Sequence, residues 1–366
     1  MGAAEFEIAG LYDPAAPNAA ERLELLEWLA ARGVSIERMV QAVRGRASLS
    51  GLAGDLVLRP ADSIGCAEVA RRAGLAPEQV QAIRLAAGLP PVTPNDATFS
   101  SEDARGFAAF ATAAELFGEQ AIWRFLRVIG SALDRIAEGA VALFLVNIEA
   151  PFRERKASEL ALAQANLRAV ESLAVIPDVI HGLFLGHMQT AIRRLREAKK
   201  DGASDTVNLA IGFVDLVGFT PLSRTVGMRA LAEVVERFEE TAHDVATSRD
   251  GRVVKLIGDE VMFAAVSPAA ACDIALTLVE RLCCGVPVTP RGGLAYGEVL
   301  LRGGDYYGPV VNLAARIAEL AVPNELLVTP EVAHGAGAAG LRFEPAGKRM
   351  PKGFDAPVSL MTLERA

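Results

Sequence analysis

Cysteine is scarce in this 366-residue chain, and the four cysteines lack the spacing of a structural site. None belongs to a CxxC pair and they repeat at no fixed interval, so the sequence predicts neither a zinc ribbon nor a disulfide framework. Reduced thiols in a cytoplasmic protein are the expected state. The four are Cys66, Cys272, Cys283 and Cys284.

Long hydrophobic runs are missing as well. The longest, AVALFLVNI at residues 140–148, is far shorter than the ~20 residues that a membrane-spanning helix needs, and we expect it to form a buried core helix. The N-terminal stretch MGAAEFEIAG has no basic segment followed by an apolar one. The sequence therefore predicts neither a signal peptide nor a membrane span.

Positive charge is in deficit, with 37 Lys and Arg against 45 Asp and Glu and a net charge of −8. This balance disfavours broad electrostatic binding to nucleic acid or to an anionic membrane surface. The chain is 51% hydrophobic and 22% charged, which is typical of a globular protein. Its length is sufficient for two domains.

The first half, residues 1–197, has the pattern of an all-helical domain. ERLELLEWLAARG at 21–33 predicts a helix that ends at a glycine cap. A last helix over 178–198 carries one apolar stripe at helical spacing, and a polar linker follows at 198–206. The stripe consists of Ile180, Phe184, His187, Ala191 and Leu195.

The second half, residues 207–366, alternates between strand and helix patterns. GRVVKLI and EVMFAAV predict a hairpin around Gly258 and Asp259. The order β-α-β-β-α-β with additions is that of the ferredoxin-like, or palm, arrangement. The predicted fold class is therefore α+β, with a helical domain followed by a palm-type domain.

The segment FVDLVGFT at 213–220 places Asp215 within an apolar strand and Gly218 where the backbone can turn closely. A carboxylate followed by exposed backbone N–H groups suits a metal ion and a phosphate. Taken alone, a strand-end aspartate that caps the next helix is the better interpretation.

The segment KLIGDE places Lys255 in an apolar strand, which is unfavourable unless another group pairs with it. Asp259 lies at the hairpin tip, where turn geometry alone favours aspartate. Asp215 and Asp259 on adjacent strands would nevertheless be able to hold two divalent cations, the usual arrangement for in-line attack at phosphorus.

A third segment, GGDYYGPVVNLAARI at 303–317, contains Asp305 and a helix with Asn312 and Arg316 four residues apart on one face. A planar guanidinium beside an amide suits a phosphate with developing charge and a sugar oxygen. An ordinary surface arginine is the alternative, and it is the better explanation for this segment alone.

Together the three segments resemble, in order and spacing, the catalytic domain of class III nucleotidyl cyclases. The resemblance covers about residues 206–364. It implies that Asp215 and Asp259 bind two divalent cations, Mg²⁺ or Mn²⁺. It also implies that Lys255 and Asp305 read adenine, since guanylyl cyclases typically have Glu and Cys there.

The same resemblance assigns the ribose to Asn312 and the transition-state charge to Arg316. Lys352, in the weaker match MPKGFDAPVSLMTL, falls where the family has a lysine on the triphosphate, although Met350 and Pro351 depart from the family pattern. The implied reaction converts ATP to 3′,5′-cyclic AMP and pyrophosphate in a head-to-tail homodimer with active sites at the interface. The backbone of 217–220 would hold the phosphates, through Gly218, Phe219 and Thr220.

The arrangement of a helical half followed by such a domain resembles that of a group of soluble actinobacterial adenylyl cyclases. The resemblance implies that residues 1–197 regulate catalysis and support dimerisation. Some of that group respond to pH, and His181 and His187 lie on the junction helix, where a charge change could shift it. An ordinary half-buried histidine is an equally good explanation. A second hypothesis is that the helices around 107–152 hold an apolar ligand.

Three other functions compete with this one. Residues 63–90 resemble a helix-turn-helix, which would make the chain a DNA-binding regulator, but the candidate recognition helix at 77–88 holds a single basic residue. An inactive nucleotide-binding scaffold is disfavoured because the six residues that the family needs for catalysis are all present: Asp215, Lys255, Asp259, Asp305, Asn312 and Arg316. A diguanylate cyclase is disfavoured because LIGDEVMF lacks the second glycine of that family's hairpin.

Overall fold

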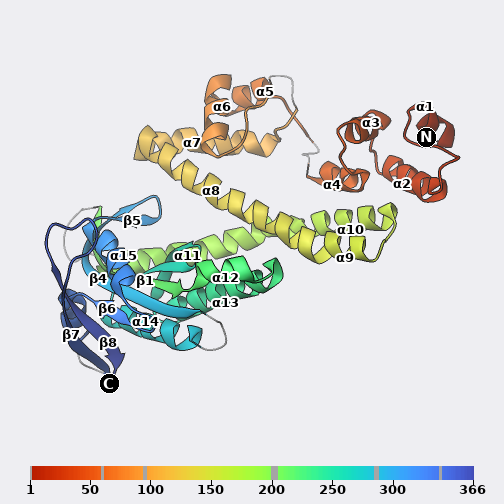
Figure 1. Cartoon of the computed structure of the whole chain (residues 1–366). Coiled ribbons are helices and arrows are strands. Elements are labelled where there is room, and N and C mark those ends of the chain that lie inside the picture. The colour runs from red at the N-terminus through yellow and green to blue at the C-terminus, as the bar shows by residue number, and fades with distance from the viewer. Residues whose placement is uncertain (1, 59–61, 94–96, 199–204, 284–287, 338–339) are drawn as a thin grey trace. The chain divides into compact units, whose positions relative to one another are not determined.

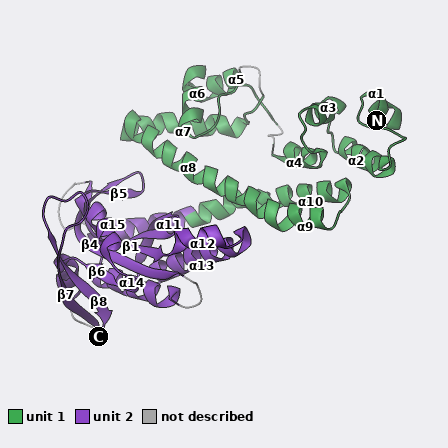
Figure 2. Ribbon diagram, viewed as in Figure 1, with its two compact units in different colours: residues 1–183 green, residues 184–366 purple. Residues whose placement is uncertain are grey.

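The computed structural model describes the whole chain except residues 1, 59–61, 94–96, 199–204, 284–287 and 338–339 (Figure 1). It forms two compact units, residues 1–183 and residues 184–366 (Figure 2). The first is helical and the second contains the sheet, so the predicted α+β fold class is confirmed.

Unit 1 contains helices and no named strand among its described residues. Their ends follow local chemistry: α7 begins with a capping box in which Ser100 and Asp103 satisfy each other's backbone N–H groups, and Gly33 follows α2 at φ 87°. The helices are α1 (Ala3–Ile8), α2 (Ala19–Ala31), α3 (Ile36–Arg44), α4 (Leu52–Val57), α5 (Cys66–Ala73), α6 (Pro77–Ala86), α7 (Ser101–Phe117), α8 (Glu119–Phe144), α9 (Ala150–Glu154) and α10 (Glu159–Ser172), with short turns η1 (Leu49–Gly51), η2 (Leu145–Glu149) and η3 (Leu173–Val175).

The prediction of a buried core helix at 140–148 is wrong. This stretch spans the end of α8 and the π-helical turn η2, and Val141, Leu143 and Val146 are 53%, 67% and 68% exposed. Hydrophobicity alone does not indicate burial, and in the described part of the chain these side chains stay exposed. Helix α11 (Ile176–Ala198), which joins the units, likewise exposes half of Phe184.

One helical stretch, Glu159–Ala198, is long and apolar enough to cross a membrane by length and composition. It combines α10, η3 and α11. The prediction of no membrane span was based on the shorter apolar run at 140–148, which is a different stretch of the chain. A single stretch of this kind is a weak indication of a membrane span.

Unit 2 is a mixed sheet in the order β2-β3-β1-β4-β6-β8-β7, with β5 added to β4. The chain order β1-α12-α13-β2-β3-α14-β4 contains the predicted palm arrangement, with the short helix α12 as an addition. The strands are β1 (Thr206–Val217), β2 (Gly251–Ile257), β3 (Glu260–Ala265), β4 (Thr289–Arg302), β5 (Asp305–Tyr307), β6 (Leu326–Val328), β7 (Leu341–Arg349) and β8 (Val358–Arg365). The helices are α12 (Phe219–Thr225), α13 (Met228–Thr247), α14 (Pro268–Leu282), α15 (Pro309–Leu320) and α16 (Pro330–Ala336).

Each face of this sheet has its own core. Phe238 of α13 and Ile274 of α14 pack on one face, around Phe263 of β3. Ala314 and Ala318 of α15 pack on the other face. Helix α15 can lie close to β4 because Gly293 has no side chain.

Gly293→Ala is expected to lower the thermal midpoint, with a loss of about 2–3 kcal/mol in the free energy of unfolding. A Cβ at this position would lie 2.3 Å from the backbone nitrogen of Ala318, so the helix itself would have to move. Gly227→Ala is the matched control, since its Cβ would meet nothing within 4 Å. Thermal denaturation of the two variants gives the comparison, and equal midpoints would contradict the close packing.

Candidate active site

The sheet brings the two predicted metal-binding aspartates close together, with Asp215 on β1 and Asp259 in the turn between β2 and β3 rather than on a strand. Asp215 of β1 lies opposite Glu260 of β3 in the antiparallel register. The backbone N–H of Leu216 donates to the carbonyl of Asp259 at 3.1 Å. Gly218 then turns the chain into α12 with φ 93°, a conformation in which glycine carries no steric cost. The backbone of 217–220 thus begins directly beside the carboxylates.

Arg291 is the counter-ion of Asp215, and sequence reasoning missed it. Its Nε and Nη2 donate to Oδ2 of Asp215 at 3.1 and 2.9 Å. Its Nη1 donates to the carbonyls of Glu319 and Ala321 at the C-terminal end of α15. The one available signal was a lone basic residue at the start of the apolar strand RGGLAYGEVLL.

Negative charge is in excess around this arginine. Burial raises the pKa of Asp259, and the nearby charge of Asp215 adds to the effect. Burial, followed by the charges of Asp215, Glu319 and Asp259, raises the pKa of Glu260 to about 7. Like charges crowded into a half-buried site are stabilised by an added cation.

The oxygen ligands at this edge fit a hard divalent cation such as Mg²⁺ or Mn²⁺. Both ions take few protein carboxylates when substrate phosphates supply the remaining oxygens. Among the residues that the structure describes, no group of three or more His, Cys, Asp or Glu side chains has the arrangement of a complete metal site.

The lysine in the apolar strand has a partner. Nζ of Lys255 donates to Oδ2 of Asp305 at 2.7 Å, and Oδ1 of Asp305 accepts from the backbone N–H of Tyr306 at 2.8 Å. The two side chains are 39% and 25% exposed, so the pair is partly desolvated while one edge remains open. This arrangement offers a cation and an acceptor side by side to a ligand.

Asn312 and Arg316 lie on the side of α15 that does not pack on β4, where Asn312 is exposed and Arg316 is half-buried. Arg316 donates to the carboxylate of Glu319 one turn further along. Lys352 lies in the loop between β7 and β8 and is exposed. Within the described part of the chain it makes no hydrogen bond or ion pair to the other predicted site residues.

Two family models match this chain. Residues 4–192 match the adenylate cyclase regulatory domain, and residues 202–359 match the adenylate and guanylate cyclase catalytic domain. The first match alone covers more than half of the chain.

Curated relatives agree with these matches. An uncharacterized protein of Mycobacterium tuberculosis (strain ATCC 25618 / H37Rv) is 33% identical over 98% of this chain and 93% of its own length. An adenylate cyclase of Glutamicibacter nicotianae is 30% identical over 71% of this chain and 68% of its own length. A pH-sensitive adenylate cyclase of M. tuberculosis (strain CDC 1551 / Oshkosh) is 28% identical over 94% and 88%. The chain therefore belongs to the class III adenylate cyclases in which an adenylate cyclase regulatory domain precedes the catalytic domain.

Proposed function

We propose that the enzyme forms 3′,5′-cyclic AMP by attack of the ATP ribose 3′-oxygen on the α-phosphorus, with pyrophosphate leaving. The contact between Lys255 and Asp305 carries this proposal. Adenine presents an amino donor next to a ring-nitrogen acceptor, and a carboxylate beside an ammonium complements that edge. Guanine presents a carbonyl in place of the amino group. This carbonyl and the Asp305 carboxylate would face each other as two acceptors with no proton to share.

Asp215 and Asp259 would hold two divalent cations, Mg²⁺ or Mn²⁺. When bound, such cations neutralise phosphate charge and favour deprotonation of the attacking hydroxyl. Arg291 ties the Asp215 carboxylate to the end of α15 and keeps it in place before substrate arrives. The backbone N–H groups of Gly218, Phe219 and Thr220 would bind phosphate oxygens at the turn after β1.

Asn312 would orient the ribose, and Arg316 would stabilise the charge that develops at the α-phosphate. In the free chain Arg316 is paired with Glu319, so substrate binding requires an exchange of partners. Lys352 would reach the triphosphate from the exposed loop before β8. No residue in this set is assigned as a general base.

The active site would be shared between two copies of the chain in a head-to-tail homodimer. One copy would supply Asp215 and Asp259, and the other would supply Lys255, Asp305 and the α15 residues. Apolar side chains beside both sets support a partner: Ile257 at the hairpin tip is 49% exposed and Tyr307 of β5 is 51% exposed.

The test is cyclic nucleotide production by the purified full-length protein with ATP or GTP and Mn²⁺. Cyclic AMP from ATP that disappears in Asp215→Ala would support the proposal. A fragment of residues 200–366 measured in parallel would show whether the first half inhibits or activates. Absence of product from both proteins would contradict the proposal.

Residues 1–197 would form the regulatory and dimerisation domain, 198–206 the linker and 207–366 the catalytic domain. A further part of the proposal is that pH controls the enzyme through this domain, as the name of the pH-sensitive relative indicates for that protein. His181 and His187 are exposed on α11, which leads into the catalytic half. Histidine ordinarily changes charge between pH 5 and 8.

His187→Ala is expected to flatten the dependence of cyclase activity on pH between 5.5 and 8, because an alanine carries no charge at either end. Turnover measured across this range in both proteins gives the comparison. His334→Ala, on helix α16 rather than on α11, is the control and should keep the wild-type profile. An unchanged profile in the His187 variant would remove this residue from the proposal.

An apolar ligand is a second candidate input. Unit 1 has a pocket of about 700 Å³ whose walls come from α6, α7 and α8. Phe107, Phe110, Leu126 and Leu133 line it, which places it within the helices expected to hold such a ligand. Binding of a fluorescent fatty acid that Leu126→Trp blocks would support this input, and unchanged binding in that variant would contradict it.

A further inference from the structure

Asp305 is presented by a turn that has little stiffness of its own. Strands β4 and β5 pair as Arg302 with Asp305, so Gly303 and Gly304 are the two central residues of the turn. Both have positive φ, 60° and 80°, as a tight hairpin turn requires. Glycines have the widest conformational freedom in the chain, so contacts from neighbouring side chains add to the strand pairing in fixing the position of Asp305.

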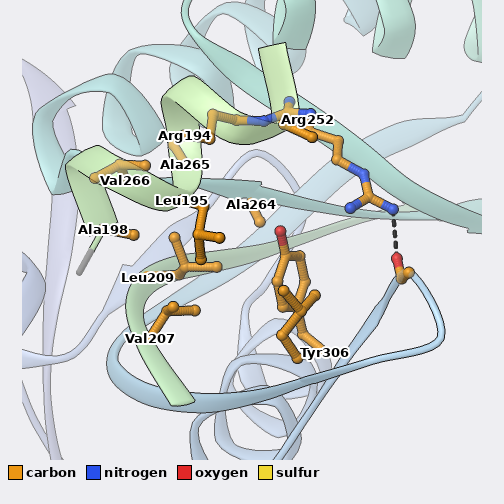
Figure 3. Close-up of a pocket in the computed structure, with 13 residues that line it drawn as sticks. Arg194, Leu195, Ala198, Val207, Leu209, Arg252, Ala264, Ala265, Val266 and Tyr306 are labelled. Carbon is orange, nitrogen blue, oxygen red and sulfur yellow. Dashed lines mark hydrogen bonds between the residues drawn. The ribbon is translucent and has the colours of Figure 1, made fainter. Parts of the chain in front are cut away.

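Arg252 of β2 contacts the residues on both sides of Asp305. Its Nη2 donates to the carbonyl of Gly304. Its guanidinium carbon lies 5.6 Å from the centre of the Tyr306 ring, within the range of a cation–π interaction. Figure 3 shows this side chain extended toward the turn, with Tyr306 beneath it.

A β-bulge in β2 places the side chains of Arg252 and Lys255 on the same side of the sheet. Arg252 pairs with Ala264 and Lys255 pairs with Met262, so β2 has one residue more than β3 between them. Residues three apart in a regular strand face opposite sides of the sheet. The extra residue, Val254, shifts the alternation by one, so Arg252 and Lys255 face the same side. Both long side chains therefore reach one turn.

We propose that Arg252 is a positioning residue for base selection, which holds the turn of residues 303–306 so that the Asp305 carboxylate stays on Lys255. The inference rests on the base-reading function proposed for that pair. Arg252 itself makes no contact with the base in this arrangement. It acts by limiting where Asp305 can lie, and so sets how strongly adenine is preferred.

Arg194 of α11 offers a matched control. It lines the same pocket of about 280 Å³ as Arg252, Gly304 and Tyr306. Burial lowers the pKa of Arg194, the charge of Tyr306 raises it, and the charge of Arg252 lowers it further. Within the described residues, no hydrogen bond joins Arg194 to the turn. Removing its charge therefore changes the pocket without releasing Asp305.

The experiment measures kcat and KM for ATP and GTP in the full-length wild type and in Arg252→Met, Arg252→Lys and Arg194→Met. GTP is measured as an inhibitor of ATP turnover where its own turnover is too slow. Arg252→Met should lower the preference for ATP over GTP about tenfold, mainly through the KM for ATP. Arg252→Lys should restore most of it, because lysine also donates to the carbonyl, and Arg194→Met should keep the wild-type preference.

An equal loss of kcat/KM for ATP and GTP in Arg252→Met would mean that Arg252 has only a structural role, and this would overturn the inference. An unchanged preference, or no recovery in Arg252→Lys, would overturn it as well. If Arg252→Met has a lowered thermal midpoint, Arg252→Lys and Arg252→Gln decide between these outcomes. A wild type that makes cyclic AMP without preferring ATP over GTP would instead contradict the function proposed for Lys255 and Asp305.

Discussion

Asp215→Asn is expected to lower cyclic AMP formation by on the order of 10³-fold or more, because metal binding supplies several kcal/mol of transition-state stabilisation. Asparagine keeps the shape of the side chain and can still accept from Arg291, which lies 2.9 Å from the carboxylate. Only the charge is lost. The variant therefore separates the proposed metal-binding role of Asp215 from its packing in the sheet.

Turnover at saturating ATP and Mn²⁺ binding by calorimetry are the two measurements, and both should fall in Asp215→Asn. Asp250→Asn is the matched control with the same change of charge. Asp250 lies at the turn before β2 with φ 55°, which asparagine tolerates, and its side chain is 86% exposed. If Asp215→Asn keeps more than a tenth of wild-type turnover, this carboxylate is not a metal ligand.

The local sequence was sufficient to predict most of unit 2. Apolar runs interrupted by Gly258 and Asp259 predicted the hairpin of β2 and β3, because β3 is buried, β2 is half-buried and the turn needs these residue types. The cost of an unpaired charge in a strand predicted a partner for Lys255, and the resemblance to class III cyclases pointed to Asp305. The catalytic roles of these residues stay predictions.

The features that were missed depend on the order of strands in space. Arg291 reaches Asp215 because β4 lies beside β1, on the side opposite to β3, and this neighbour relation has no local signature. Strand β7, LRFEPAGKR, is largely exposed and alternates poorly, so only its pairing with β8 makes it a strand. The exposure of residues 140–148 was missed for the converse reason, since an apolar run does not indicate which surface covers it.

A mixture of two inactive variants should regain activity if the active site is shared between two chains. Asp215→Asn removes the proposed metal-binding half of a site, and Arg316→Ala removes the proposed charge-stabilising half, at an expected loss of about 10²–10³-fold in turnover. In a head-to-tail dimer of one Asp215→Asn chain and one Arg316→Ala chain, both defects fall in the same site. The second site then has wild-type residues throughout.

Random pairing of equal amounts makes half of the dimers mixed, and each mixed dimer has one intact site. The mixture should therefore recover about a quarter of wild-type turnover, after the two proteins are unfolded and refolded together so that subunits exchange. Asp215→Asn mixed with Lys255→Ala should recover to the same extent, because Lys255 is assigned to the same half as Arg316. Asp215→Asn mixed with Asp259→Asn should recover nothing, since both residues belong to the other half. Recovery in none of the mixtures would mean that each chain holds a complete site. The active site would then lie within one subunit, where Arg291 contacts Asp215 and also binds the end of α15.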